Sequence, residues 1–116
     1  MKKLLFVVLF LALPATSYAA TNLISWTDGS TNEDGFKVER CSGALTCTNF
    51  SQIGTPTAAN VTSFTDSAAL TGANCYRVRA YNTGGHSVYS NTACITNVAP
   101  PDGAPSQVTV TTVTVP

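Results

Sequence analysis

The chain has 116 residues, of which 10% are charged, and its six Lys and Arg balance six Asp and Glu. This length favours one small domain. Composition predicts no basic surface, so the sequence lacks the electrostatic footprint of a protein that binds nucleic acid or anionic lipid.

The first 19 residues have the three parts of an export signal. Lys2 and Lys3 form the charged start, residues 4–13 form an apolar run, and Ser17 and Ala19 supply small residues before the cleavage site. A transmembrane anchor is the alternative, but a helix needs about 20 apolar residues to span a bilayer. We therefore expect cleavage after Ala19, which leaves four basic against six acidic residues and no later membrane segment.

No stretch has sustained helical periodicity. Short β-branched and aromatic runs separated by turn residues predict an all-β sandwich. The strands are expected, in chain order, at residues 23–27, 36–40, 50–53, 61–65, 76–81 and 87–96. The most regular is 76–81, where alternation places Tyr76, Val78 and Ala80 inward and turns Arg77 and Arg79 to water.

Four cysteines in a short exported chain indicate two disulfides rather than a metal site. The spacing from Cys41 to Cys47 is wider than a zinc knuckle, and the only histidine, His86, lies in a glycine-rich turn. Neither candidate pair has the Cys-x-x-Cys spacing of redox proteins. We expect no cofactor and no metal.

Five motifs follow one another in order: Trp26-Thr27-Asp28 and residues 32–40, 60–66, 76–82 and 87–91. Together they resemble bacterial fibronectin type III repeats over about residues 22–97. The resemblance implies a two-sheet antiparallel sandwich of immunoglobulin-like type. We expect Trp26 to be buried between its sheets.

The chain departs from this family at its start and at one corner. The opening strand is absent before Trp26, the turn from Leu70 to Tyr76 is one residue short, and Asn74 replaces the tyrosine usual at that corner. The hydroxyl of such a tyrosine ties the corner down, so another constraint is needed.

Two disulfides are predicted as that constraint. The register of the hairpin that turns at residues 82–86 places Cys75 opposite Cys94, and Cys41 and Cys47 bracket a short loop that a bridge can close. In the chain-entropy model such bridges contribute roughly 2–3 kcal/mol each.

The tail after residue 97 begins with a proline-rich connector, which is stiff and extended. Residues 107–115 then have the pattern of a spare β-strand, in which a shift at Thr111-Thr112 implies a bulge. The residues expected to pair are Val108, Val110, Val113 and Val115.

The tail could replace the missing opening strand, whose absence leaves about 5 kcal/mol of apolar burial unused beside Trp26. Three arrangements stay open. The tail docks on the next molecule, or it folds back onto its own domain, or the chain is a fragment of a longer protein.

Catalytic and calcium-binding patterns are weak. No serine lies in a Gly-x-Ser-x-Gly elbow, and Glu33 and Asp34 are adjacent, unlike paired glycosidase carboxylates. With Asp28 and Asn32 they could offer oxygen ligands to calcium, but they lack the EF-hand pattern. We interpret them as solvated turn residues and expect no enzyme.

The sequence thus predicts a signal peptide at 1–19, a fibronectin type III domain at 20–97, and a connector with a C-terminal strand at 98–116. The function expected is a structural or binding role in the periplasm, at the cell surface or in the medium. The partner would be a protein, a carbohydrate or a second copy. The alternative is a spacer fragment of a secreted multidomain polysaccharide hydrolase.

Overall fold

The computed structural model describes residues 18–110. This part of the chain contains β-strands and no helix. The strands are β1 (Ala20–Ser25), β2 (Gly35–Ser42), β3 (Ser51–Gln52), β4 (Thr57–Ala58), β5 (Ser63–Ala69), β6 (Gly72–Asn82), β7 (Gly85–His86) and β8 (Ala93–Asn97).

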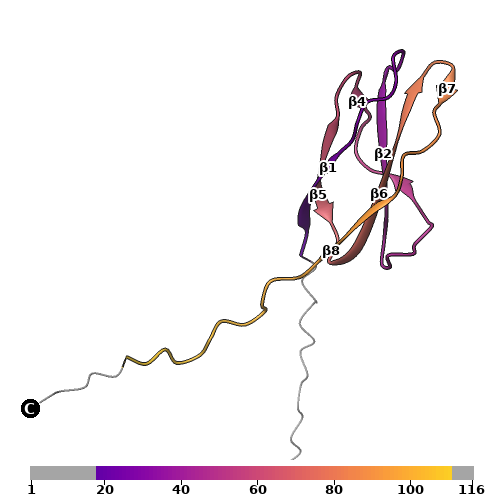
Figure 1. The fold of residues 1–116 in the computed structure, drawn as a ribbon. Helices are drawn as coiled ribbons and strands as arrows, with labels where there is room; N and C mark the ends of the chain where they lie inside the picture. Colours follow the sequence, from indigo (N-terminus) through magenta and orange to yellow (C-terminus); the bar gives the residue numbers. More distant parts are fainter. Residues whose placement is uncertain (1–17, 111–116) are drawn as a thin grey trace, which may run out of the picture.

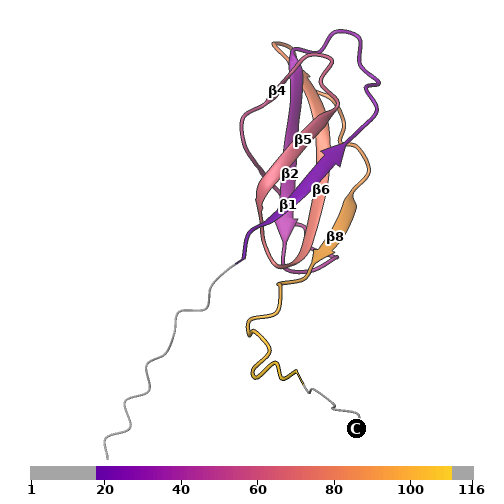
Figure 2. The ribbon, with the colours of Figure 1, turned by 90° about the vertical axis from the view of Figure 1, so that its left-hand side faces the viewer.

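The strands form two sheets, as Figures 1 and 2 show. One sheet consists of β1 and β5, and the other contains β2, β3, β4, β6, β7 and β8. Every ladder is antiparallel. The prediction of an all-β fold with two antiparallel sheets is therefore confirmed.

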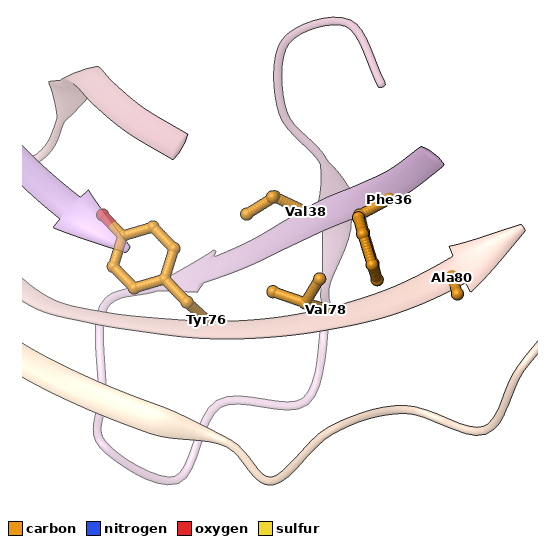
Figure 3. Packing of buried hydrophobic residues seen from close by; sticks show 5 residues of the cluster. All are labelled: Phe36, Val38, Tyr76, Val78 and Ala80. Atoms are coloured by element: carbon orange, nitrogen blue, oxygen red, sulfur yellow. The ribbon is translucent and has the colours of Figure 1, made fainter. Parts of the chain in front are cut away.

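The core lies where β2 and β6 face the smaller sheet. Five side chains on one face of these two strands are buried, and Figure 3 shows them meeting: Phe36, Val38, Tyr76, Val78 and Ala80. Since strand side chains alternate between faces, this set confirms the predicted inward face of β6. The second sheet contributes Ile24 and Phe64 to the same cluster.

Trp26 contacts this core but is only half-buried. Its ring centroid lies 5.4 Å from that of Phe36. The prediction that Trp26 is buried between the sheets was thus too strong. Its outer side borders a groove between β1 and β8.

The strand expected at residues 87–96 is interrupted, because serine side chains replace backbone carbonyls as hydrogen-bond acceptors for β6. The amide of Ala80 donates to the hydroxyl of Ser87 at 3.0 Å, and the amide of Val78 donates to the hydroxyl of Ser90 at 2.9 Å. Each hydroxyl thus takes the place of a backbone carbonyl. Of the predicted strand, only the part in β8 is regular, and β7 lies before it.

The corner between β5 and β6 is held by Asn74, which is completely buried. Its amide group donates to the Leu70 carbonyl at 2.6 Å, and its oxygen accepts from the Ser42 hydroxyl at 2.7 Å. The residue expected to weaken this corner therefore supplies the constraint itself.

The two disulfides join Cys41 to Cys47 and Cys75 to Cys94, in the pairs that loop closure and hairpin register favour. Cys41 and Cys75 are also cross-strand partners on β2 and β6, so the bridges lie next to each other. Beside Asn74, they staple the end of the large sheet where β8 finishes.

A buried polar chain links the two sheets at the same end. Asn22 donates to the Tyr76 hydroxyl at 2.9 Å, and this hydroxyl donates to Asp66 at 2.7 Å. Arg40 pairs with the same carboxylate at 2.8 Å. Burial by itself raises the pKa of Asp66, but the hydrogen bonds from Tyr76 and Arg40 outweigh it, and the pKa is lowered. Burial also raises the pKa of Tyr76 to about 12.

Candidate functional site

Strand β1 has an open edge. Among residues 18–110, its only strand partner is β5. The amide of Trp26 donates to the Thr62 carbonyl at 3.0 Å, so this pair is hydrogen-bonded. Because hydrogen-bonded and non-hydrogen-bonded pairs alternate in an antiparallel ladder, Leu23 and Ser25 present their N–H and C=O groups to the open side.

A groove runs along this open edge, between β1 and β8. It consists of two adjoining hollows of about 330 and 390 Å³. Both hollows are lined by Ile24, Ser25, Tyr76 and Ala93. In Figure 2, β1 crosses in front of β2 and β6, and β8 lies beside β6.

The groove exposes side chains that belong to the inner face of the sandwich. Ala93 and Ile95 pair with Tyr76 and Asn74, which are both buried, so the four residues share one face of the large sheet. Ile95 is nevertheless 48% exposed, because no strand lies over this part of the sheet in the described chain. We call this strip the β1–β8 groove.

The strands that flank the groove carry little protection against pairing, since their one such feature is the bulge between Ala20 and Asn22 in β1. Natural edge strands are usually blocked by charged residues, proline or bulges at their edges. Neither β1 nor β8 contains a charged residue or a proline. The only charged residue in the groove lining, Arg77, turns its guanidinium to the opposite face of the sheet. The groove therefore suits an uncharged extended segment.

The candidate strand residues in the tail lie away from this groove in the single chain. Residues 98–110 belong to no strand and are exposed, with Val108 at 86% and Val110 at 90%. Val113 and Val115 lie outside the described residues. The described part of the tail thus shows no return onto its own β1.

The opposite face of the large sheet is covered by its own side chains. The Arg77 guanidinium lies 3.6 Å from the ring centroid of Tyr89 and 4.2 Å from that of Phe50. It also donates to Glu39 at 2.8 and 3.0 Å. Arg77 and Arg79 are each only 26% exposed, so the prediction that they face water was wrong.

This arrangement, which we call the arginine–aromatic ladder, was not predicted from the sequence. The alternation of side chains along a strand predicts the face on which each lies, but not which residues cover that face. Glu39 is directly opposite Arg77 on β2, and that pairing was a usable signal. Burial raises the pKa of Glu39, but hydrogen bonds from Arg77 and Tyr89 outweigh it, and the pKa is lowered. The ladder is a closed structural unit.

The remaining polar side chains lie in or beside turns. Asp28 accepts a hydrogen bond from the Ser30 amide, and Glu33 accepts one from the Asn60 amide. His86 lies 3.0 Å from the Lys37 ammonium, and partial desolvation together with the charges of Arg79 and Lys37 lowers its pKa.

The sulfur atoms of Cys41, Cys47 and Cys75 lie within 4.8 Å of one another. All three are in disulfides and offer no thiolate to a metal.

In residues 18–110, no helix has the length and apolar character needed to cross a membrane. No protein-family model matches this chain, and a search of curated proteins finds no significant match.

Proposed function

We propose that this chain is an exported, non-enzymatic module of fibronectin type III character that binds an extended protein segment along β1. Its role is structural or adhesive, at the cell surface or outside the cell. The observation that carries the proposal is the open edge of β1 beside the β1–β8 groove. An added strand would hydrogen-bond to Leu23 and Ser25 and bury the inner side chains that are now exposed.

The fibronectin type III character is supported by the motif order together with the arrangement of strands. The Trp26 motif follows β1, and the motifs at residues 32–40 and 76–82 fall on the neighbouring strands β2 and β6. A strand before β1 would complete the smaller sheet of β1 and β5.

Export is supported by the two disulfides, since such bonds form and persist in oxidising compartments. With cleavage after Ala19, the mature chain would begin at Ala20, the first residue of β1. The vacant edge would then have to be filled by a segment from elsewhere.

The energy available from filling the groove is large for a domain of this size. Two or three inward side chains on an incoming strand are worth about 1.5–3 kcal/mol each, or about 5 kcal/mol together. Small domains have a net stability of about 5–15 kcal/mol. Filling the edge would therefore raise the stability markedly.

The test is selection of extended decapeptides from a displayed library on the chain truncated after Ala104. We expect binders with apolar residues two apart. Ser25→Pro should abolish their binding, since it removes an open-edge N–H without breaking a bond to β5. Ser25→Ala, which keeps the N–H, is the matched control. Binding that survives Ser25→Pro would contradict the proposal.

A second candidate is a spacer segment of a longer secreted polysaccharide hydrolase. It is favoured by residues 98–110, which leave the sandwich as an exposed, proline-rich link. The intact mass of the natural protein separates the two candidates. A mass equal to the mature chain supports the stand-alone module, and a much larger mass supports the spacer.

A further inference from the structure

We infer that the segment that fills the β1–β8 groove is the C-terminal tail, residues 107–115, of a second copy of this chain. It would run antiparallel to β1, entering beside Trp26 and ending beside Ala20. Copies would thereby join head to tail. This inference rests on the proposed function and names its partner.

The direction in which the tail leaves the sandwich favours pairing with a second copy. Asn97 is paired with Gly72, and Ala20 with Ala69, so β8 ends at the end of the sandwich where β1 begins. Figures 1 and 2 both show the tail continuing away from this end. A tail turning straight back along its own β1 would therefore run parallel to it.

Every ladder in the structure is antiparallel, and antiparallel pairing is the more stable per residue. To pair antiparallel with its own β1, the tail would first have to pass the whole strand, which is about 20 Å long. The connector could span about 30 Å when fully extended. Its three prolines stiffen it in the outward direction. A neighbour's tail that arrives at the Trp26 end meets none of these obstacles.

The tail is also chemically complementary to the groove. The chain after Asp102 has no charged residue, which matches the uncharged strands β1 and β8. Val108 and Val110 are two positions apart, so they fall on one face of a strand. Both are almost fully exposed in the single chain.

The pairing that we infer has the following register. With Val108 opposite Trp26 and Val110 opposite Ile24, both valines face inward over the floor formed by Tyr76 and Val78. Thr109 then lies opposite Ser25, where it exchanges backbone hydrogen bonds with the open edge and turns its side chain to solvent. The tail leaves at the Ala20 end of the groove, whereas a neighbour's tail enters at the Trp26 end. The contact therefore joins two different surfaces head to tail and gives an open chain of copies.

The first experiment measures the molar mass of the exported chain by size-exclusion chromatography with light scattering over a hundredfold range of concentration. We expect the mass to rise above the monomer in steps of one chain. Val108→Asp/Val110→Asp should give a monomer at every concentration. Thr109→Asp, a charge on the outward face of the same segment, should still assemble. A wild-type chain that stays monomeric overturns the inference.

The second experiment separates the donor from the acceptor. The Val108→Asp/Val110→Asp chain keeps the groove but has no usable tail, and Ser25→Pro keeps the tail but has no usable edge. Each should be monomeric alone, and the mixture should give a dimer of one chain of each kind. Leu23→Pro, which also disables the edge and keeps the tail, replaces Ser25→Pro as the donor in case Ser25→Pro does not fold. A mixture that remains two monomers overturns the inference.

The outcomes also separate this inference from the proposed function. If library peptides bind the groove but the tail does not, the binding module stands and the second-copy partner falls. If neither binds at the β1 edge, both fall. A melting temperature that drops with Val108→Asp/Val110→Asp in a strictly monomeric protein would show docking within one molecule, and would also contradict assembly.

Discussion

The two faces of the large sheet are covered to different extents. On its outer face, Phe50 and Tyr89 cover Arg77, and Glu39 neutralises it, so a charged strand face is closed by the chain's own residues. Beside β8, the inner face of the same sheet leaves Ile95 exposed. The chain thus covers its arginine-rich outer face with its own residues, whereas the described residues leave the apolar strip beside β8 uncovered. This contrast makes the groove the more informative region.

The largest effect is expected from the closed core. Phe36→Ala should lower the free energy of unfolding by about 3–5 kcal/mol, since Phe36 is buried among core residues from both strands. Trp26→Ala should cost less in the monomer, because one side of Trp26 borders the groove. Leu23→Ala, on the exposed face of β1, is the control and should change little. Denaturant unfolding measures all three. Equal losses for Phe36 and Leu23 would refute the packing described.

A smaller effect is expected at the corner beside the groove. Asn74→Ala removes the hydrogen bonds that this completely buried side chain makes to Leu70 and Ser42, which should cost about 1–3 kcal/mol. Asn91→Ala, at an exposed position, should stay within about 0.5 kcal/mol of the wild type. Thermal unfolding of the two variants measures the difference. A corner that melts unchanged after Asn74→Ala would mean that the disulfides alone hold it.

Stability should also fall at acid pH. The pKa of Asp66 is held below its ordinary value of 3.8 in the folded protein. Its contribution is therefore present above about pH 4 and is lost as the pH falls through the lowered pKa. Asp66→Asn should reduce the dependence of stability on pH below about 4, and Asp102→Asn, in the exposed connector, should not. Identical acid unfolding curves for Asp66→Asn and the wild type would contradict this.

The smallest effect is expected in the arginine–aromatic ladder. Tyr89→Phe removes only the hydrogen bond from the hydroxyl to Glu39 and should cost about 1 kcal/mol. Tyr89→Leu also removes the ring under Arg77 and should cost roughly another 0.5–1 kcal/mol. Denaturant unfolding of the pair separates the two terms. If Tyr89→Leu matched Tyr89→Phe, stacking on Arg77 would contribute nothing to stability.

The sequence predicted the parts that depend on alternation and register. Tyr76, Val78 and Ala80 follow a period of two, and the hairpin fixes Cys75 opposite Cys94. It could not show that the hydroxyls of Ser87 and Ser90 replace backbone carbonyls, because this depends on how closely the returning segment approaches β6.

The contacts that stabilise the corner and the outer face could not be predicted from the sequence. Asn74 matters through four hydrogen bonds that exist only once its neighbours are folded around it. Arg77 looked exposed because periodicity does not reveal aromatic rings arriving from distant segments. For the groove, the sequence indicated a missing strand, and the structure supplied the open side of β1 and its lining.

In the assembly that we propose, a second copy's tail pairs with the open edge of β1. This pairing can be tested by amide hydrogen exchange of the exported chain, compared between dilute and concentrated solution. Ile24 and Trp26, which bond to β5, should be protected at both concentrations. Leu23 and Ser25 should exchange quickly in dilute solution and become protected in concentrated solution. Leu23 and Ser25 amides that exchange quickly at every concentration would contradict the claim.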